Sequence, residues 1–324
     1  MGAFLVRRLI FGLFAVFVAI SLSFFYFASK FYPLRGGPTL HEYWVWLSGI
    51  PTGKSFSHGL LNAHLLPMVG AAFGRTMALL ALTLVIVVVL AIPLGLISAA
   101  TRGSGLDLGV RIGTYVAWAV PGFVVAIVLQ QGFGRLPLGW GLGWFPGVGW
   151  AGTCPGGEGV DIGTGLCPAA GHGLTHVAQV IYHLTLPALA LALGFVAINA
   201  RYLRNSLLDS LDAPYITVAR GKGLSERAVL LGHGLRNALV VFVPALVSDI
   251  GLIFGGALVV DYVFKLGGMG TLFLALLPYS AEQVILVDTY ALMLLFLFAA
   301  VVMITASTLG EAVVALLDPR VRLE

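Results

Sequence analysis

Residues 77–100 read MALLALTLVIVVVLAIPLGLISAA and contain no charged side chain. This run of 24 residues exceeds the roughly 20 that an α-helix needs to cross the hydrocarbon layer of a bilayer. Pro93 lies inside the run, and membrane helices tolerate an internal proline because neighbouring groups satisfy the carbonyl that it leaves free. The stretch therefore predicts a transmembrane helix.

The composition of the whole chain supports the same class of protein. Of the 324 residues, 59% are hydrophobic and only 10% are charged, whereas about 25% are charged in soluble proteins. These values exclude a water-soluble fold, and we expect no binding to nucleic acid. The sequence predicts an all-α polytopic membrane protein with six transmembrane helices, at residues 9–28, 77–100, 112–129, 177–200, 238–260 and 290–316.

Lysine and arginine are distributed unevenly between the two sides of the membrane. When the sides alternate from the N-terminus, one side carries twelve of these cations: Arg7, Arg8, Arg102, Arg111, Arg201, Arg204, Arg220, Lys222, Arg227, Arg236, Arg320 and Arg322. The other side carries six: Lys30, Arg35, Lys54, Arg75, Arg135 and Lys265. The positive-inside rule then predicts that both termini are cytoplasmic. The first span is too long for the apolar core of a signal peptide, and no convincing small-residue cleavage site follows it, so we expect an uncleaved anchor.

Two cysteines, Cys154 and Cys167, lie in the loop between the third and fourth predicted spans. On this topology the loop is extracytoplasmic, where a disulfide persists. Closing a loop of this size contributes about 3 kcal/mol, so we expect a disulfide; two unpaired thiols are the alternative. Two cysteines cannot supply a four-ligand metal site, and we expect no bound metal.

The cytoplasmic segment 201–237 differs from the spans around it, because it contains many residues that begin and end helices. We expect Asp212 to cap a short helix over residues 213–220 that has Pro214 in its first turn, and Gly221 and Gly223 to end that helix. Ser225 should cap a second helix, over 226–237, that leads into span five. Since the chain shows no catalytic constellation, we expect a transport, signalling or scaffolding protein and not an enzyme.

The sequence 214–227, PYITVARGKGLSER, is followed by His233, Arg236, Asn237 and Ala238. It resembles the signature of the inner-membrane permease subunits of peptide/nickel-type ABC importers, the oligopeptide and dipeptide permease family. That signature usually reads D-Y-x-R-T-A-R-A-K-G-L-S before H-x-x-R-N-A. The resemblance extends, in the same order, to residues 142–146, 183–189, 259–264, 268–270 and 317–322.

The resemblance covers most of the chain from about residue 76 onward. It divides the chain into residues 1–75, with the anchor helix and the first extracytoplasmic loop, and residues 76–324, the permease core with its cytoplasmic coupling loop, 201–237. It implies the type I ABC importer permease fold, in a bacterial-type inner membrane.

The resemblance also implies partners and a substrate. The partners are a second permease that is a paralogue of this chain, two cytoplasmic ATPase subunits, an extracytoplasmic substrate-binding protein and membrane lipid. ATP and Mg would be bound by the ATPase subunits, and this chain would bind no cofactor. Di- or oligopeptides are the expected substrate; a nickel chelate, glutathione or a sugar is the alternative.

In that family the coupling loop binds the ATPase, which implies the same role for residues 213–224. Tyr215 and Leu224 would be apolar anchors in a groove of the ATPase, and Arg220 and Lys222 would meet its acidic rim; a merely basic loop facing the membrane is the alternative. The residues expected at this contact are Ala213, Pro214, Tyr215, Ala219, Arg220, Lys222, Gly223, Leu224 and Ser225.

One carboxylate, Asp249, lies well inside span five. An ionised Asp at the centre of a bilayer costs ~2.5 to 3.5 kcal/mol on insertion scales, so we expect Asp249 to face the translocation pathway; a structural hydrogen bond to another subunit is the alternative. A rival function, a proton-coupled secondary transporter, would use Asp249 as its proton carrier, but such proteins usually contain internal repeats and we see none. Gly251 and Gly255 have small-xxx-small spacing, which predicts close packing at the interface between two permeases.

Overall fold

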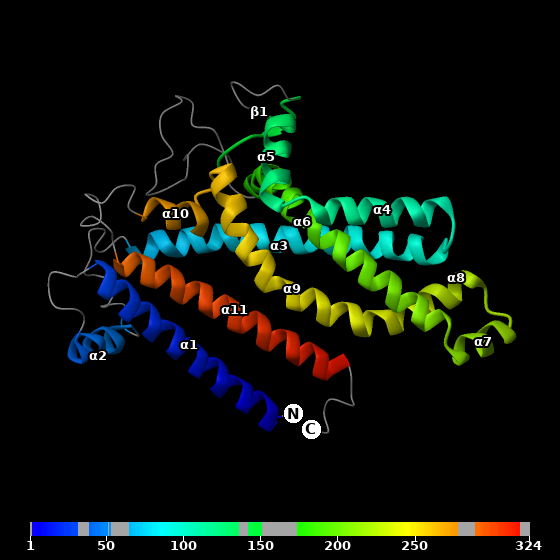
Figure 1. Ribbon diagram of the computed structural model, residues 1–324, viewed down its shortest axis with the longest axis horizontal. Coiled ribbons are helices and arrows are strands. Elements are labelled where there is room, and N and C mark those ends of the chain that lie inside the picture. Colours follow the sequence, from blue (N-terminus) through cyan, green and yellow to red (C-terminus); the bar gives the residue numbers. More distant parts are fainter. Residues whose placement is uncertain are drawn as a thin grey trace.

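A computed structural model of the chain describes residues 2–31, 39–50, 52, 65–135, 142–150, 174–277 and 289–317. In these segments the regular structure is helical, apart from one pair of two-residue strands (Figure 1). The elements in chain order are α1 (Gly2–Phe31), α2 (Leu40–Gly49), α3 (Leu65–Ala100), α4 (Gly105–Ala119), α5 (Gly122–Phe133), β1 (Gly134–Arg135), β2 (Phe145–Pro146), α6 (Leu174–Leu211), α7 (Pro214–Gly221), α8 (Glu226–Ala228), the π-helix η4 (Val229–Gly234), α9 (Leu235–Phe264), α10 (Met269–Ala275) and α11 (Thr289–Leu317).

Four of the predicted spans are present as long helices. The helical segments that are long and apolar enough to cross a membrane are Leu65–Ala100, Val177–Leu211, Glu226–Phe264 and Ala291–Gly310. They correspond to predicted spans two, four, five and six. The first three helices are longer than the predicted spans, because their backbone hydrogen bonds continue into residues that hydropathy places outside the hydrocarbon layer.

The third predicted span, residues 112–129, is not one straight helix. It is divided between α4 and α5, whose axes differ by 98°. The break lies at Val120, which has an extended backbone (φ −86°, ψ 122°), and at Pro121. Proline cannot donate a backbone hydrogen bond and disfavours helical backbone in the residue before it, so α4 ends there. The bent pair is a fifth span only if its two helices are counted together.

The first predicted span lies within α1, which packs against α11 (Figure 1). The apolar part of α1 identified in the structure, Ile10–Tyr26, is shorter than the other spans. Length and apolarity in the described residues therefore support four spans, or five with the bent pair, and leave the count of six unconfirmed. The division at residues 75 and 76 also stays a prediction; both residues lie within α3.

The first predicted loop contains a helix, α2, that the sequence analysis did not anticipate. Thr39 and Glu42 form a reciprocal capping box at its start, with hydrogen bonds of 2.9 and 3.2 Å. Tyr43 and Trp46 are buried against Phe24 of α1, with ring centroids 5.4 and 5.0 Å apart respectively. These aromatic contacts hold α2 against the end of α1.

The centre of the bundle is α6, which packs against α3 and α9 (Figure 1). One group of buried apolar side chains, including Leu203 and Phe242, joins these three helices alone. A second group, including Leu184 and Phe264, also takes in α1, α2, α5, α10 and α11. Because the C-terminal end of α6 leads directly into α7, this packing supports the base of α7.

Candidate functional site

A short helix, α7, lies at one end of the molecule, between the end of α6 and the start of α8 (Figure 1). Pro214 occupies its first turn, as predicted. The predicted cap is wrong: the N-cap is Ala213, which has an extended backbone and makes no side-chain hydrogen bond. Because Pro214 keeps the preceding residue out of the helical conformation, Asp212 lies one position too early to cap. The carboxylate of Asp212 instead pairs with Arg102, after α3, at 3.3 Å.

The end of α7 follows the predicted glycine pattern. Gly221 is its last residue, and Gly223 has a φ of +81°, a left-handed conformation that glycine adopts without steric cost. This turn lets the backbone N–H of Leu224 donate to the carbonyl of Ala219 at 3.4 Å. Ser225 then caps α8 by accepting a hydrogen bond from the N–H of Ala228 at 3.3 Å, which confirms the predicted cap.

Two faces of α7 have different environments. Its inner face is buried: Ile216 and Ala219 pack against Val229 of η4 and against Leu211 at the end of α6. On the outer side, Tyr215 is 44% exposed, and beyond the helix Leu224 is 41% exposed. The buried contacts fix the orientation of α7. The exposed apolar side chains include Tyr215 and Leu224, which were predicted to contact a partner, and also Val218, which is 59% exposed and was not predicted.

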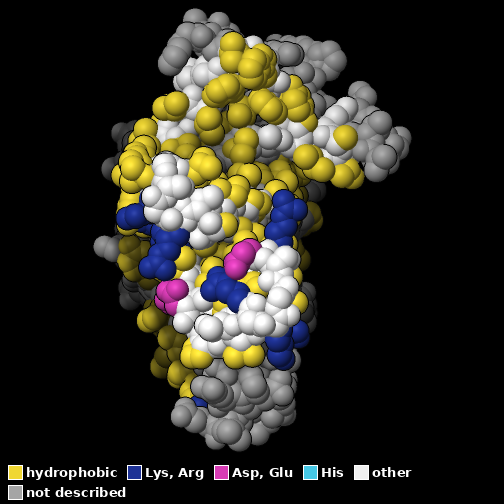
Figure 2. Space-filling view, turned by 90° about the vertical axis from the view of Figure 1, so that its right-hand side faces the viewer, with side chains coloured by type: hydrophobic (Ala, Val, Ile, Leu, Met, Phe, Trp, Pro, Cys, Tyr) yellow, Lys and Arg dark blue, Asp and Glu magenta, His cyan; other side chains and the backbone are white. Residues whose placement is uncertain are grey.

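The charges around α7 are mostly positive (Figure 2). Arg220 donates to both carboxylate oxygens of Glu226, at 2.9 and 3.3 Å. This hydrogen bonding raises the pKa of the Arg220 guanidinium above its ordinary value. Arg220 therefore already has an acidic partner in its own chain. Lys222 is exposed and forms no ion pair within the described residues.

The second predicted helix, over 226–237, is divided into three parts. α8 passes into the π-helix η4, where the N–H of Leu235 donates to the carbonyl of Leu230, and then into α9. Gly234 lies against Leu207 and Leu211 of α6: a Cβ added there would lie 3.6 and 3.3 Å from their side chains. The wider π turn thus lets the start of α9 approach α6 closely, next to the base of α7.

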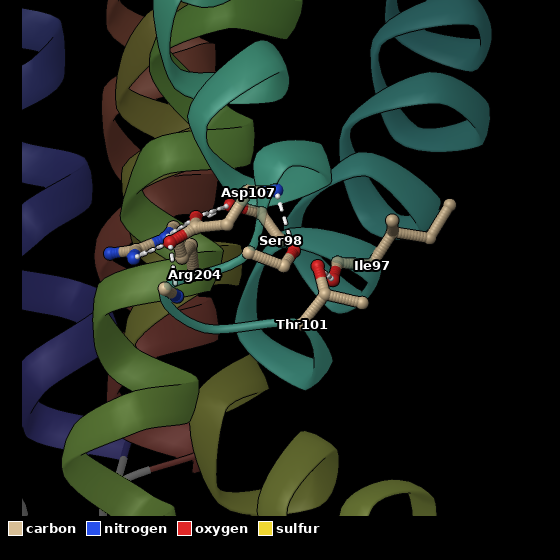
Figure 3. A network of polar contacts seen from close by, with 7 residues as sticks. Ile97, Ser98, Thr101, Asp107 and Arg204 are labelled. Atoms are coloured by element: carbon tan, nitrogen blue, oxygen red, sulfur yellow. Dashed lines mark hydrogen bonds and ion pairs between the residues drawn. The ribbon is translucent and has the colours of Figure 1, made fainter.

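A buried polar network, missed by the sequence analysis, connects α6 with the turn between α3 and α4 (Figure 3). Arg204 donates from Nε and Nη2 to the two carboxylate oxygens of Asp107, each at 2.9 Å. Ser98 Oγ donates to the same carboxylate at 2.6 Å, and the N–H of Gly103 does so at 3.1 Å. Side-chain exposure is 2% for Asp107 and 14% for Arg204.

A guanidinium and a carboxylate that are paired through two hydrogen bonds have a defined geometry. The network therefore fastens the turn between α3 and α4 to α6, close to the base of α7. The only local signal in the sequence is a serine three residues before an acidic residue, Ser104 and Asp107, which is typical of a helix start. Ser104 does cap α4, accepting from the N–H of Asp107 at 3.3 Å. That pattern says nothing about Arg204.

Asp249, the predicted pathway residue, is half-buried in α9. Its carboxylate accepts a hydrogen bond of 2.7 Å from Nδ2 of Asn199, a residue of α6 that the sequence analysis did not single out. Asp249 therefore has a partner within its own chain. Whether it also faces a pathway stays a prediction.

The two glycines of the predicted packing face, Gly251 and Gly255, have different surroundings. A Cβ on Gly251 would lie 2.9 Å from the side chain of Met303, so at this position α9 packs against α11 of the same chain. A Cβ on Gly255 would have no neighbour within 4 Å. Of the two, only Gly255 presents an open face to a second subunit.

A second buried carboxylate, Asp261, lies near the C-terminal end of α9. It accepts hydrogen bonds from the N–H groups of Gly268 and Thr271, at 2.8 and 2.6 Å. The N–H of Met269 donates to Thr76 Oγ1 of α3 at 2.9 Å. These contacts fasten α10 to α9 and α3. This role of Asp261 was not predicted, because predicted span five ends at residue 260, whereas α9 continues to Phe264.

Cys154 and Cys167 lie outside the described residues, so their pairing stays a prediction. We expect mass spectrometry of peptides from the unreduced, alkylated protein to find the two cysteines linked, because both belong to one predicted extracytoplasmic loop. A protease that cleaves at Glu158 or Asp161 separates the two cysteines. The same digest after reduction is the control, and it should release two separate peptides. Two individually alkylated cysteines in the unreduced sample would contradict the disulfide.

Long apolar helices that pack into one bundle, with a short helix exposed at one end, define a polytopic helical membrane protein. Residues 91–323 match the family described as "Binding-protein-dependent transport system inner membrane component". The chain belongs to this family of transport permease subunits.

Individual relatives indicate the kind of permease that the chain is similar to. The chain is 30% identical to a putative peptide permease protein of Brucella suis biovar 1, over 87% of the chain and 79% of the relative. It is 28% identical to the oligopeptide transport system permease protein AppB of Bacillus subtilis, over 88% and 81%. It is 29% identical to the glutathione transport system permease protein GsiC of Pectobacterium atrosepticum, over 72% and 66%. The resemblance to peptide-type permeases is thereby confirmed.

Proposed function

We propose that this chain is the transmembrane permease subunit of an ATP-driven importer that translocates di- or oligopeptides delivered by an extracytoplasmic binding protein. Membership of a binding-protein-dependent family supports the delivery step. The names of the relatives from Brucella and Bacillus support a peptide substrate. The glutathione permease among the relatives favours a second candidate, glutathione, which is itself a small peptide.

The observation that carries the proposal is the construction of α7. On its buried face, Ile216 and Ala219 pack against the rest of the molecule, and on its exposed face lies Tyr215. In the proposed complex, two cytoplasmic ATPase subunits bind ATP and Mg, one of them contacts α7, and its movement on hydrolysis is transmitted through α6 and α9. The permease chain itself would then carry out no hydrolysis.

The proposed complex also contains a second permease, a paralogue of this chain. The open face of α9 at Gly255 is the surface that we assign to it. Both termini would be cytoplasmic, as the twelve-to-six distribution of Lys and Arg predicts. α7 would then lie on the cytoplasmic side, where ATPase subunits are available.

The proposal is tested by purifying the intact complex and reconstituting it in vesicles. We expect two ATPase subunits and a second permease to co-purify, and uptake of a tripeptide to require both ATP and the loaded binding protein. A protonophore at constant ATP should leave uptake unchanged. If the protonophore abolishes uptake instead, the chain is a proton-coupled transporter and the proposal is wrong.

A further inference from the structure

Asn199 and Asp249 place two oxygen acceptors next to each other, one from α6 and one from α9. Asn199 is 0% exposed, and its Nδ2 donates to Asp249 at 2.7 Å and to the carbonyl of Phe195 at 2.9 Å. Both of its donors are thus used, while its Oδ1 has no hydrogen-bond partner in the structure. A buried amide oxygen without a partner is costly, which indicates that a donor is missing.

The Asp249 carboxylate is likewise without a counter-charge. Within the described part of the chain it forms no ion pair. The next cations along α6 are engaged elsewhere: the Arg201 guanidinium lies 4.7 Å from the ring centre of Tyr115, and Arg204 is paired with Asp107. The Asn199 Oδ1 therefore lacks a hydrogen-bond donor, and the Asp249 carboxylate lacks a positive charge.

We propose that Asn199 and Asp249 form a binding station for the protonated amino terminus of a peptide as it crosses the membrane. An ammonium group supplies what the station lacks, since it carries one positive charge and three N–H donors. The carboxylate and the Asn199 Oδ1 take two of these donors, and water takes the third. This inference rests on the proposed peptide transport.

The position of the station suits a passing ligand. Asp249 is half-buried, so part of it is open to a ligand. In the proposed pathway, water on that side would weaken the attraction to a cation, which permits release. Every unmodified peptide carries the same ammonium group whatever its side chains, so the station would recognise peptides without selecting among sequences. A Lys or Arg of the second permease is the competing occupant, and the test below distinguishes it.

The test uses the complete complex in vesicles, with ATP and saturating binding protein. Uptake of alanine tripeptide and of its N-acetylated form is measured for the native complex and for each variant. The rate of each variant is divided by the rate of the native complex for the same peptide, so that any preference of the binding protein cancels. Asp249→Asn should lower uptake of the free peptide about tenfold, the scale of a lost charge-assisted hydrogen bond, and should lower the acetylated form much less. Asp249→Glu should retain most uptake, and Ser248→Ala is the matched control.

A second measurement covers the case in which the acetylated peptide is not transported. Asp249→Cys, modified with a negatively charged methanethiosulfonate, should regain uptake, and the positively charged reagent should inhibit it further. Equal loss for both peptides, or a complex that no longer assembles with Asp249→Asn, would assign Asp249 to a contact between subunits and overturn the station. Native uptake for Asp249→Asn would overturn it too. The ATP dependence of uptake by the native complex is measured in the same vesicles. A failure of the proposed ATP-driven import is therefore distinguished from a failure of the station.

Discussion

Replacing Gly223 by Asp is expected to abolish transport while the permease remains in the membrane. Gly223 has a φ of +81° at the end of α7, next to the exposed Leu224. A residue with a Cβ in this left-handed conformation costs roughly 1 to 2 kcal/mol, although Asp tolerates it better than most. The added carboxylate would also stand in the surface proposed to bind the ATPase. We therefore expect the ATPase subunits to be lost from the purified complex and uptake to fall to background.

Two variants separate the causes of this loss. Gly223→Asn has nearly the same volume and also tolerates the left-handed conformation, but adds no charge. Gly105→Asp introduces the same charge at the first residue of α4, where a Cβ would meet no neighbour within 4 Å and a helix start favours an acid. The Gly105 variant should assemble and transport normally. Normal uptake by Gly223→Asp, with the ATPase still bound, would remove α7 from the coupling contact.

Replacing Arg204 by Ala is expected to destabilise the permease severely. The substitution leaves the Asp107 carboxylate, which is 2% exposed, with only Ser98 Oγ and the N–H of Gly103 as donors. Breaking a buried ion pair by removing one partner costs about 3 to 5 kcal/mol. We expect a large drop in the apparent melting temperature of the purified protein and a lower amount in the membrane.

Arg102→Ala is the matched control, because it removes an arginine from the same end of the molecule. Its ion pair with Asp212 has side-chain exposures of 61% and 69%, and exposed pairs contribute only about 0 to 1 kcal/mol. The double variant Asp107→Ala with Arg204→Ala should be less damaging than the sum of the single variants, since neither charge is left buried alone. Equal melting temperatures for Arg204→Ala and Arg102→Ala would contradict the role of the network.

The sequence alone determined the class of protein and the limits of the short helix α7. Hydropathy fixes a membrane helix wherever a run of about 20 apolar residues occurs, and four of the predicted spans were found that way. Pro214, Gly223 and Ser225 set the start and end of short helices through local backbone geometry, so the limits of α7 could be predicted within one residue. Asp212 does not cap α7, because Pro214 keeps the residue before it, Ala213, out of the helical conformation.

Only the tertiary structure could decide which side chains meet. Asp107 and Arg204 are 97 residues apart in the chain, and Asn199 and Asp249 are 50 apart. Hydropathy and helix periodicity describe one helix at a time, and they carry no information about which face of α6 meets α4 or α9. A polar residue inside an apolar helix indicates that a partner must exist, because an unpaired polar group is costly there. The packing of α6 against its neighbours decides which residue that partner is.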